Sequence, residues 1–289
     1  MTNNRVVLIG EPNVGKSSLL NALVGEKVSI VTNLPGTTRD KISGFTGNFE
    51  IFDTPGMHKS NNMLGKHMRK SISAAVAEAD VILYVLDAVN FTERDIEKIA
   101  NYRDRQPVIV AVNKTDRTNF EKLYPRLEKL GELDFVRAIV PVSATTGFNV
   151  NILASEIAKL LPNTPAAQDP DIYTSQSIRQ MTAEIIRASI ITHTRAEVPH
   201  GVAVLITKFN ERKEITEIHA DIICEKASHK PIIIGKGGAM LGKIGEWARL
   251  RIEAMLDANV NLQTHLVVRP DWKNDKELLD KLKYTAGAK

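Results

Sequence analysis

Hydrophobic runs alternate with amphipathic stretches along the first part of the chain. Continuous runs of Val, Ile and Leu, each followed by a turn and a helical pattern, occupy residues 6–9, 81–86, 108–112 and 138–142. Such runs are typical of strands buried on both faces of a parallel sheet that helices cover. In residues 41–52 hydrophobic and polar positions alternate instead, which predicts a hairpin and one antiparallel edge strand. The pattern predicts a doubly wound, mostly parallel α/β domain over residues 1–161.

The helical pattern ends near Leu161 and is followed by a proline-rich stretch. Residues 162–170 contain three prolines, which remove backbone donors and fix φ. We therefore predict a linker over residues 162–173 and a second, α+β domain over residues 174–289. In that domain the pattern predicts helices at 175–194, 238–257 and 274–283, and strands at 202–209, 214–225, 231–234 and 260–268.

The composition is that of an average soluble globular protein, with 43% hydrophobic and 25% charged residues. A net charge of +4 gives only weak support for a nucleic-acid partner. The single cysteine, Cys224, excludes an internal disulfide and a multi-cysteine zinc site, and its β-branched neighbours predict a buried position. The sequence has no apolar run long enough to span a membrane and no signal peptide before the first strand, so we expect a cytoplasmic protein.

A glycine-rich motif, GEPNVGKS, lies at residues 10–17 between the first predicted strand and a helix. In this setting it is a phosphate-binding loop, whose backbone N–H groups and helix N-terminus bind phosphate oxygens. Lys16 would reach the β- and γ-phosphates, and the Ser17 hydroxyl would bind Mg²⁺. The predicted nucleotide-binding residues of this region are Gly10, Pro12, Asn13, Val14, Gly15, Lys16, Ser17 and Ser18.

Three further motifs follow in chain order, each at the end of a predicted strand: DTPG (53–56), NKTD (113–116) and the pair Ser143-Ala144. Asp53 would hold Mg²⁺ through water, and Gly56 would present its N–H to the γ-phosphate. Asp116 can accept from both N1–H and the amino group of guanine, a pair of donors that adenine lacks. The set predicts a GTP-hydrolysing switch, whose further nucleotide-binding residues are Asp53, Gly56, Asn113, Lys114, Asp116, Ser143 and Ala144.

Residues 33–40 are polar and glycine-containing, as expected for a segment that orders around a γ-phosphate. Either Thr37 or Thr38 would give Mg²⁺ a second protein hydroxyl, beside Ser17 and Asp53. The position where many GTPases place a water-orienting glutamine is Met57, so we expect slow intrinsic hydrolysis with a partly borrowed catalytic apparatus. The predicted catalytic residues are Asn13, Lys16, Gly56 and whichever of these two threonines binds Mg²⁺.

The side chain of Asn13 has two interpretations. Its amide oxygen either helps to hold a monovalent cation between the phosphates, where other GTPases place an arginine finger, or bonds within the loop. The chemistry of the residue alone does not decide between them.

In the second domain a Gly-x-x-Gly motif lies between the predicted strand 231–234 and the predicted helix 238–257. Such a loop clamps the RNA backbone in KH domains, and the order of elements is that of a type II KH domain. Lys226, Lys230, Arg249 and Arg251 are either phosphate contacts or solvated, and Trp247 and Trp272 are expected to be packing residues. The predicted RNA-binding residues are Ile234, Gly235, Lys236, Gly237, Gly238 and Lys243.

The chain resembles the Era family of GTPases over essentially its whole length. The first domain carries PNVGKSSLLNAL (12–23), PGTTRD (35–40), DTPGMHK (53–59) and NKTD (113–116). The second carries AEIIR (183–187), EVPH (197–200), IGKGG (234–238) and Trp272. The chain departs from the family in a shorter N-terminal lead and in the lack of acidic residues at 174–179.

The resemblance implies a P-loop GTPase domain followed by a type II KH domain that binds the 3′ end of 16S ribosomal RNA and assists assembly of the 30S subunit. It implies that the GTP-bound form binds RNA and that RNA accelerates hydrolysis. It favours Thr38 over Thr37 as the Mg²⁺ ligand and implies that Asn13 binds K⁺. It also implies peripheral association with the inner face of the cell membrane, and we expect a monomer.

Three other classes of protein share part of this pattern. A double-G-domain GTPase of the Der type is excluded because residues 162–289 contain no second P-loop. A pure RNA-binding regulator would lack the lysine or a magnesium ligand, whereas Lys16, Ser17 and Asp53 are all present. A GTPase whose KH domain binds a protein at the membrane stays open, and a test of RNA binding distinguishes it.

Overall fold

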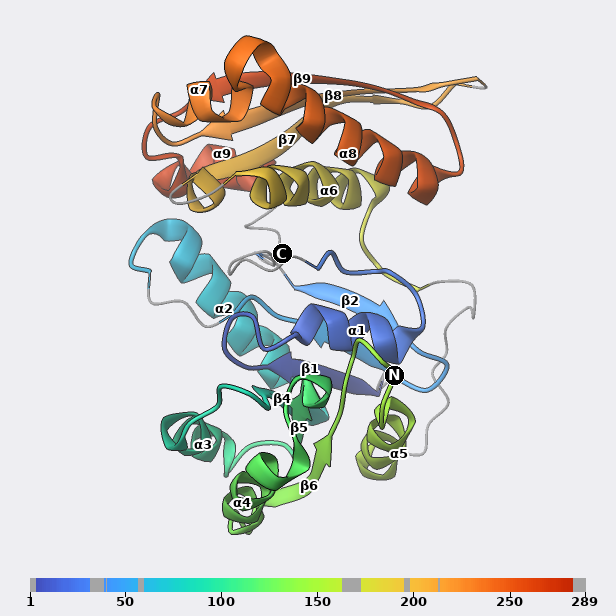
Figure 1. Cartoon of the computed structure of the whole chain (residues 1–289), viewed down its shortest axis with the longest axis vertical. Helices are drawn as coiled ribbons and strands as arrows, with labels where there is room; N and C mark the ends of the chain where they lie inside the picture. The colour runs from blue at the N-terminus through green and yellow to red at the C-terminus, as the bar shows by residue number, and fades with distance from the viewer. Residues whose placement is uncertain are drawn as a thin grey trace. The chain divides into compact units, whose positions relative to one another are not determined.

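A computed structural model of the chain describes residues 4–31, 39, 41–56, 60–162, 173–194, 198–212 and 214–282. Contacts within the chain divide it into two compact units. Most residues up to Ser175 form the first unit, and Gln176–Lys289 form the bulk of the second. Each unit is a domain with its own sheet (Figure 1).

The first domain is built on a six-stranded sheet with the strand order β2-β3-β1-β4-β5-β6. Among the described strands of this sheet only the β2–β3 pair is antiparallel, and the other neighbours are parallel. The mostly parallel sheet and its antiparallel edge hairpin confirm the fold prediction for this domain. The strands are β1 (Arg5–Ile9), β2 (Ile42–Phe45), β3 (Glu50–Asp53), β4 (Val81–Asp87), β5 (Val108–Asn113) and β6 (Val136–Pro141).

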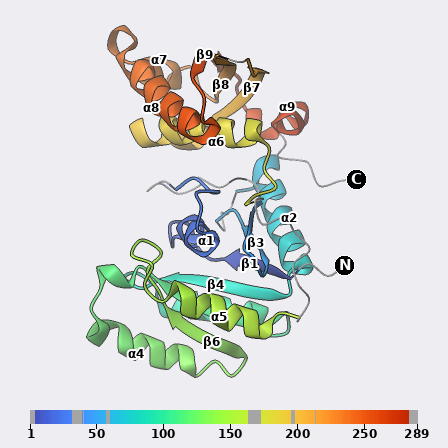
Figure 2. The same ribbon diagram turned by 90° about the vertical axis from the view of Figure 1, so that its right-hand side faces the viewer.

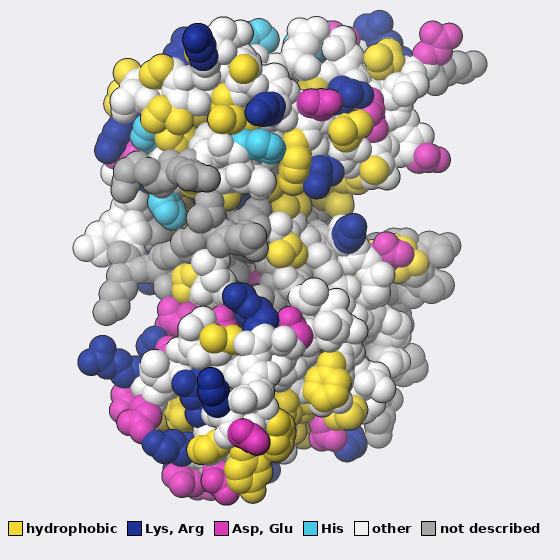
Figure 3. Space-filling model, viewed as in Figure 1, with side chains coloured by type: hydrophobic (Ala, Val, Ile, Leu, Met, Phe, Trp, Pro, Cys, Tyr) yellow, Lys and Arg dark blue, Asp and Glu magenta, His cyan; other side chains and the backbone are white. Residues whose placement is uncertain are grey.

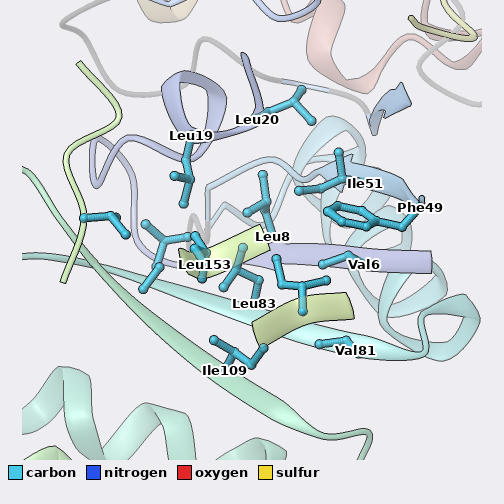
Figure 4. Packing of buried hydrophobic residues seen from close by; sticks show 14 of the residues in the cluster. Val6, Leu8, Leu19, Leu20, Phe49, Ile51, Val81, Leu83, Ile109 and Leu153 are labelled. Carbon is cyan, nitrogen blue, oxygen red and sulfur yellow. The ribbon is translucent and has the colours of Figure 1, made fainter. Parts of the chain in front are cut away.

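Helices cover both faces of this sheet. One face packs against α1 (Lys16–Val24) and α5 (Val150–Leu160), where Leu8 and Leu83 lie against Leu19 and Leu153 (Figure 4). The opposite face packs against α2 (Met63–Glu78), α3 (Glu93–Ile99) and α4 (Phe120–Gly131). Successive strand residues therefore pack on different helices, which is why the strands read as unbroken apolar runs.

The edge strand β2 is hydrogen-bonded to residues 173 and 174, which lie at the boundary between the predicted linker and the second predicted domain. The Phe45 N–H donates to the Tyr173 carbonyl at 2.9 Å, and the Thr174 hydroxyl donates to the Ser43 carbonyl at 2.7 Å. Gly44 and Thr174 form an antiparallel bridge. Thr174 thus lies on the first domain, although the sequence placed it at the start of the second. Residues 163–172 of the predicted linker lie outside the described residues.

The second domain has a three-stranded sheet with the order β7-β8-β9, in which β7 and β8 are antiparallel and β8 and β9 are parallel. Helices α6 and α8 cover one face of this sheet (Figures 1 and 2). The elements are α6 (Ile178–His193), β7 (Val202–Asn210), β8 (Thr216–Cys224), α7 (His229–Ile234), α8 (Ala239–Leu256), β9 (Val260–Val268) and α9 (Lys276–Lys281). Short 3₁₀ turns complete the described chain at Ala100–Tyr102, Thr115–Arg117, Val198–Gly201, Lys236–Gly238 and Trp272–Asn274.

The predicted strand at residues 231–234 is wrong, because this run belongs to helix α7. Pro231 lies in the first turn of the helix, where a missing N–H costs no intrahelical hydrogen bond. Ile233 is fully buried while Ile232 is exposed. Packing of α7 against α8 outweighs the strand preference of the β-branched residues. The Gly-x-x-Gly motif therefore joins two helices, not a strand and a helix.

Two expectations about single residues in this domain are confirmed. Cys224 is fully buried, and burial raises the pKa of its thiol to about 11, so the thiol is unreactive at neutral pH. Trp272 is fully buried, and its indole N–H donates to the Gly201 carbonyl at 3.2 Å. Both side chains stabilise the domain by packing.

Candidate functional sites

The loop between β1 and α1 has the backbone that a phosphate site requires. Gly15, which precedes the first residue of α1, has a left-handed backbone with φ of 95°. A Cβ on Gly15 would lie 2.3 Å from the Asn113 amide nitrogen, and a Cβ on Gly10 would lie 2.4 Å from the Val85 carbonyl oxygen. Both positions therefore require glycine. Asn13 also has a positive φ, of 63°, which asparagine tolerates better than most residues.

Lys16 lies at the start of α1 and is only 6% exposed. Its ammonium donates to the Gly10 and Glu11 carbonyls, both at 2.9 Å. Burial lowers the pKa of Lys16, and the nearby carboxylates of Asp53 and Glu11 partly oppose this effect. A buried ammonium held on the rim of an N–H-rich loop is positioned to pair with the oxygens of a polyphosphate.

The two described residues that were predicted to hold a metal are in contact. The Ser17 hydroxyl donates to Asp53 Oδ2 at 2.5 Å, and Asp53 is fully buried at the end of β3. A hydroxyl and a carboxylate beside a triphosphate site are oxygen ligands of the kind that Mg²⁺ prefers, so these residues fit a magnesium ion. The third predicted ligand, Thr38, lies outside the described residues, as does the alternative, Thr37.

The loop after β3 lies against the phosphate loop. The Thr54 hydroxyl donates to the Leu8 carbonyl at 2.7 Å, which fixes this loop beside β1. A Cβ on Gly56 would lie 3.0 Å from Pro12 Cγ, so Gly56 is packed against the phosphate loop. The contact of the Gly56 N–H with the γ-phosphate stays a prediction. Met57 lies outside the described residues.

Asn113 joins three of the predicted motifs. Its amide nitrogen donates to the Val14 carbonyl at 3.0 Å, and its amide oxygen accepts from the Ala144 N–H, also at 3.0 Å. The side chain is 1% exposed, so both bonds are protected from water. Asn113 thereby holds the phosphate loop, the end of β5 and the 143–144 loop together.

Two further residues of the NKTD motif, Lys114 and Asp116, make hydrogen bonds to two different loops. Lys114 bonds the phosphate loop, and Asp116 bonds the loop that contains Ser143. The Lys114 ammonium donates to the Asn13 carbonyl and, at 2.8 Å, to Asp87 Oδ2. Asp116 Oδ1 accepts from the Ser143 hydroxyl at 2.6 Å, which orients a carboxylate that is otherwise exposed. A planar acceptor pair held in this way, beside the Ala144 backbone, matches the hydrogen-bonding edge of guanine.

Asp87 was missed by the sequence reasoning, although a carboxylate at the end of a predicted strand was a usable signal. Burial alone raises the pKa of the Asp87 carboxyl, but hydrogen bonds from Lys114 and the Val89 N–H outweigh it and lower the pKa overall. The charged carboxylate therefore persists and holds Lys114 against the phosphate loop. Glu11 was also passed over; it accepts from Lys98 Nζ at 2.7 Å and so ties the loop to α3.

The Gly-x-x-Gly loop of the second domain is open to solvent. Gly235 is packed, because a Cβ there would lie 2.6 Å from Met240 Cβ. Gly237 and Gly238 have positive φ values of 57° and 85°, and a Cβ on either would meet no atom within 4 Å. Lys236, within the motif, and Lys243, which follows it on α8, are both exposed. Because Gly237 and Gly238 have no side chains, a phosphodiester chain could approach the backbone closely there. The two lysines beside the loop would attract its phosphates.

The other candidate RNA contacts divide into two groups. Lys226 and Lys230 are exposed, whereas Arg249 is paired with Glu253 at 2.9 Å. Arg251 stacks 3.4 Å from the centre of the Trp247 ring. Trp247 is partly buried and also packs edge-on against the His193 ring, as expected for a packing residue. Cationic and anionic side chains are interspersed over the first domain on the face in Figure 3, as expected for a chain of small net charge.

The fold and the nucleotide site define a P-loop GTPase, and the second sheet with its Gly-x-x-Gly loop defines a KH domain in the same chain. A family model described as 50S ribosome-binding GTPase matches residues 5–114, and a KH domain model matches residues 197–273. The chain is 38% identical to GTPase Era of Ruminiclostridium cellulolyticum and 40% identical to that of Caldicellulosiruptor saccharolyticus, over 96% of both chains in each case. The chain belongs to the Era family of GTPases.

Solved structures agree with this assignment. The chain is similar to a single-residue variant of Aquifex aeolicus Era bound to GDP·AlF₄⁻, with a TM-score of 0.90 and 35% identity over 98% of this chain and 99% of that one. It is equally similar, at 34% identity and the same TM-score and coverage, to Era in complex with MgGDPNP and nucleotides 1506–1542 of 16S ribosomal RNA.

The described helices include none long and apolar enough to cross a bilayer. The chain is a GTPase with a KH domain, as its sequence predicted.

Proposed function

We propose that this protein is a GTP-dependent switch that binds the 3′-terminal region of 16S ribosomal RNA through its KH domain and assists assembly of the small ribosomal subunit. The observation that carries the proposal is the open loop at residues 235–238, joined in one chain to a guanine-nucleotide site. The Era structure that contains both MgGDPNP and 16S nucleotides 1506–1542 supports the same pairing of ligands.

The residues of the site support hydrolysis of GTP by positioning and charge rather than by a strong base. Lys16 would offset charge on the β- and γ-phosphates, and the Gly56 N–H would bind the γ-phosphate. Mg²⁺, which Ser17 and Asp53 would hold, neutralises phosphate charge when it is bound. Because Met57 cannot orient a water molecule, we propose that intrinsic hydrolysis is slow and that bound RNA accelerates it.

Replacement of Gly237 by aspartate is expected to weaken binding of a 3′-terminal 16S RNA fragment by about tenfold or more, because a negative charge meets the phosphates. Aspartate tolerates the positive φ of Gly237, so the domain should still fold. Filter binding with the GTP-loaded protein measures the affinity. Gly131→Asp, which adds the same charge at an open site in the GTPase domain, is the matched control.

Intact RNA binding by the Gly237→Asp protein would contradict the proposal. It would favour a KH domain that binds another protein instead. The intrinsic GTPase rate without RNA should be unchanged in both glycine variants, because neither residue contacts the nucleotide site.

We propose that a monovalent cation, K⁺, binds between the phosphates in addition to Mg²⁺, and that the side chain of Asn13 helps to hold it. The Lys114 ammonium bonds the Asn13 carbonyl, and the left-handed backbone of Asn13 is built into the phosphate loop. If the site holds K⁺ and not Na⁺, GTP hydrolysis in K⁺ buffer should exceed that in Na⁺ buffer by about tenfold, since the bound cation adds a positive charge that stabilises the transition state. Asn13→Ala should remove the difference, and equal wild-type rates in the two buffers would refute the role of the cation.

The sequence features that carry the family resemblance also motivate a proposal about cellular behaviour. We propose that the protein is a cytoplasmic monomer that associates peripherally with the inner face of the cell membrane. Light scattering of the purified protein and flotation with lipid vesicles measure the two properties. A stable dimer, or protein that stays at the bottom of the gradient with vesicles of bacterial lipids, would contradict them.

A further inference from the structure

A second serine, Ser29, donates to the same carboxylate oxygen as the predicted metal ligand Ser17. Ser29 Oγ lies 3.3 Å from Asp53 Oδ2, the atom that also accepts from Ser17 at 2.5 Å. Ser29 is 4% exposed and Asp53 is fully buried, so water does not compete for these bonds. Ser29 carries no sequence motif of its own and was not among the predicted site residues.

The backbone of Ser29 is fixed independently of its hydroxyl. Asn21 Nδ2 donates to the Ser29 carbonyl at 2.7 Å, and the Ser29 N–H donates to Asn21 Oδ1 at 2.8 Å. The neighbouring Val28 is buried in the core that α1 shares with the sheet. The loop after α1 is therefore clamped to the helix by a pair of reciprocal hydrogen bonds.

These contacts form a closed ring that includes both described residues predicted to hold the metal, Ser17 and Asp53. Asn21 lies one turn after Ser17 on α1, Ser29 bonds Asn21, and both serines bond Asp53. The rigid helix fixes the distance between Ser17 and Asn21. The ring leaves the Asp53 carboxylate few orientations, which is the role that outer partners play for metal-binding carboxylates in general.

We infer that Ser29 is a positioning residue of the magnesium site: its hydroxyl orients the Asp53 carboxylate, and the Asn21 clamp holds the hydroxyl in place. The inference rests on the assignment of Ser17 and Asp53 as the residues that hold Mg²⁺. It also gives Asp53 a link to the chain that leads into residues 32–38, because Ser29 lies just before that segment.

The structure separates this role from a purely structural one. The Asn21 clamp uses only the backbone N–H and carbonyl of Ser29, so Ser29→Ala keeps the clamp and removes only the bond to Asp53. Asn21→Ala removes the clamp and keeps the hydroxyl. The first change should therefore affect magnesium affinity without unfolding the loop.

The test measures release of a fluorescent GDP from the full-length protein as a function of Mg²⁺ concentration. For Ser29→Ala we expect the Mg²⁺ concentration that gives half-maximal retention to rise about tenfold, with the release rate in excess EDTA unchanged. Ser29→Thr, which keeps a hydroxyl, should restore the midpoint to within about threefold of wild type. Ser155→Ala, on the exposed part of α5, is the control for serine removal.

An Mg²⁺ midpoint within about twofold of wild type for Ser29→Ala would overturn the inference. So would an equal acceleration of release in EDTA, because the hydroxyl would then support nucleotide binding in general. Wild-type release that ignores Mg²⁺ would instead contradict the assignment of Ser17 and Asp53 themselves. The Asn21→Ala protein should show the same shift in midpoint as Ser29→Ala, since it frees the hydroxyl from its position.

Discussion

Replacement of Lys16 by methionine is expected to weaken GTP binding severely while leaving the nucleotide-free protein nearly as stable as wild type. Methionine has a similar length, so it fills the same space without the charge. Loss of a buried cation that would pair with two phosphates should weaken GTP binding by about 100-fold or more. In the nucleotide-free protein the variant no longer has to bury a charged ammonium. This gain in stability offsets the loss of the two hydrogen bonds to Gly10 and Glu11.

Thermal unfolding with and without GTP measures both effects at once. GTP at about 100 times the wild-type Kd should raise the wild-type Tm by about 5–10 °C, and the Tm of Lys16→Met by no more than about 2 °C. The nucleotide-free Tm values should agree within about 5 °C. Lys159→Met is the control, since the Lys159 side chain is 67% exposed on α5. A GTP-dependent stabilisation that survives in Lys16→Met would contradict the phosphate site.

Replacement of Asp116 by asparagine is expected to convert a GTP site into one that prefers XTP. Guanine offers two adjacent donors, which both oxygens of a carboxylate can accept, whereas the asparagine amide has one acceptor and one donor. Xanthine carries a carbonyl where guanine has the amino group, so it matches the amide. The unpaired groups should weaken GTP binding by about 100-fold, while XTP binding improves.

Competition against a fluorescent guanine nucleotide measures this change in preference. The structure adds that the Ser143 hydroxyl donates to the Asp116 carboxylate at 2.6 Å and so restricts its orientation. Asp134→Asn is a matched control, because that carboxylate is 74% exposed and pairs with Arg103 instead. Retention of a strong preference for GTP over XTP by Asp116→Asn would show that another residue discriminates the base.

The strands of the first domain could be predicted from the sequence because burial on both faces leaves a clear pattern. Each run, such as those that contain Leu8 and Leu83, supplies side chains to helices on both sides of the sheet. The run at residues 231–234 is too short for its period to be read, and its β-branched residues favour a strand locally. Only its packing on α8 decides for a helix, and this contact is not visible in the sequence.

The motifs placed the nucleotide site, but they did not reveal how its parts hold one another. Asn113 joins residues that are distant in sequence, and Lys114 is held by Asp87. Ser29 and Asn21 act through Asp53 and have no local signature, because a serine in a loop or an asparagine in a helix is an ordinary residue there. Such supporting residues become visible only when the fold brings their partners together.

Control of RNA binding in the second domain by the nucleotide state of the first is the central claim for this protein. Crosslinking of the full-length protein to ribosomal RNA, followed by sequencing of the attached fragments, tests it directly in the GDP-bound form and in a form bound to a non-hydrolysable GTP analogue. We expect fragments from the 3′ end of 16S RNA to be enriched in the GTP-analogue state and lost in Gly237→Asp. Equal crosslinking in both nucleotide states, or fragments from elsewhere in the ribosomal RNA, would contradict the claim.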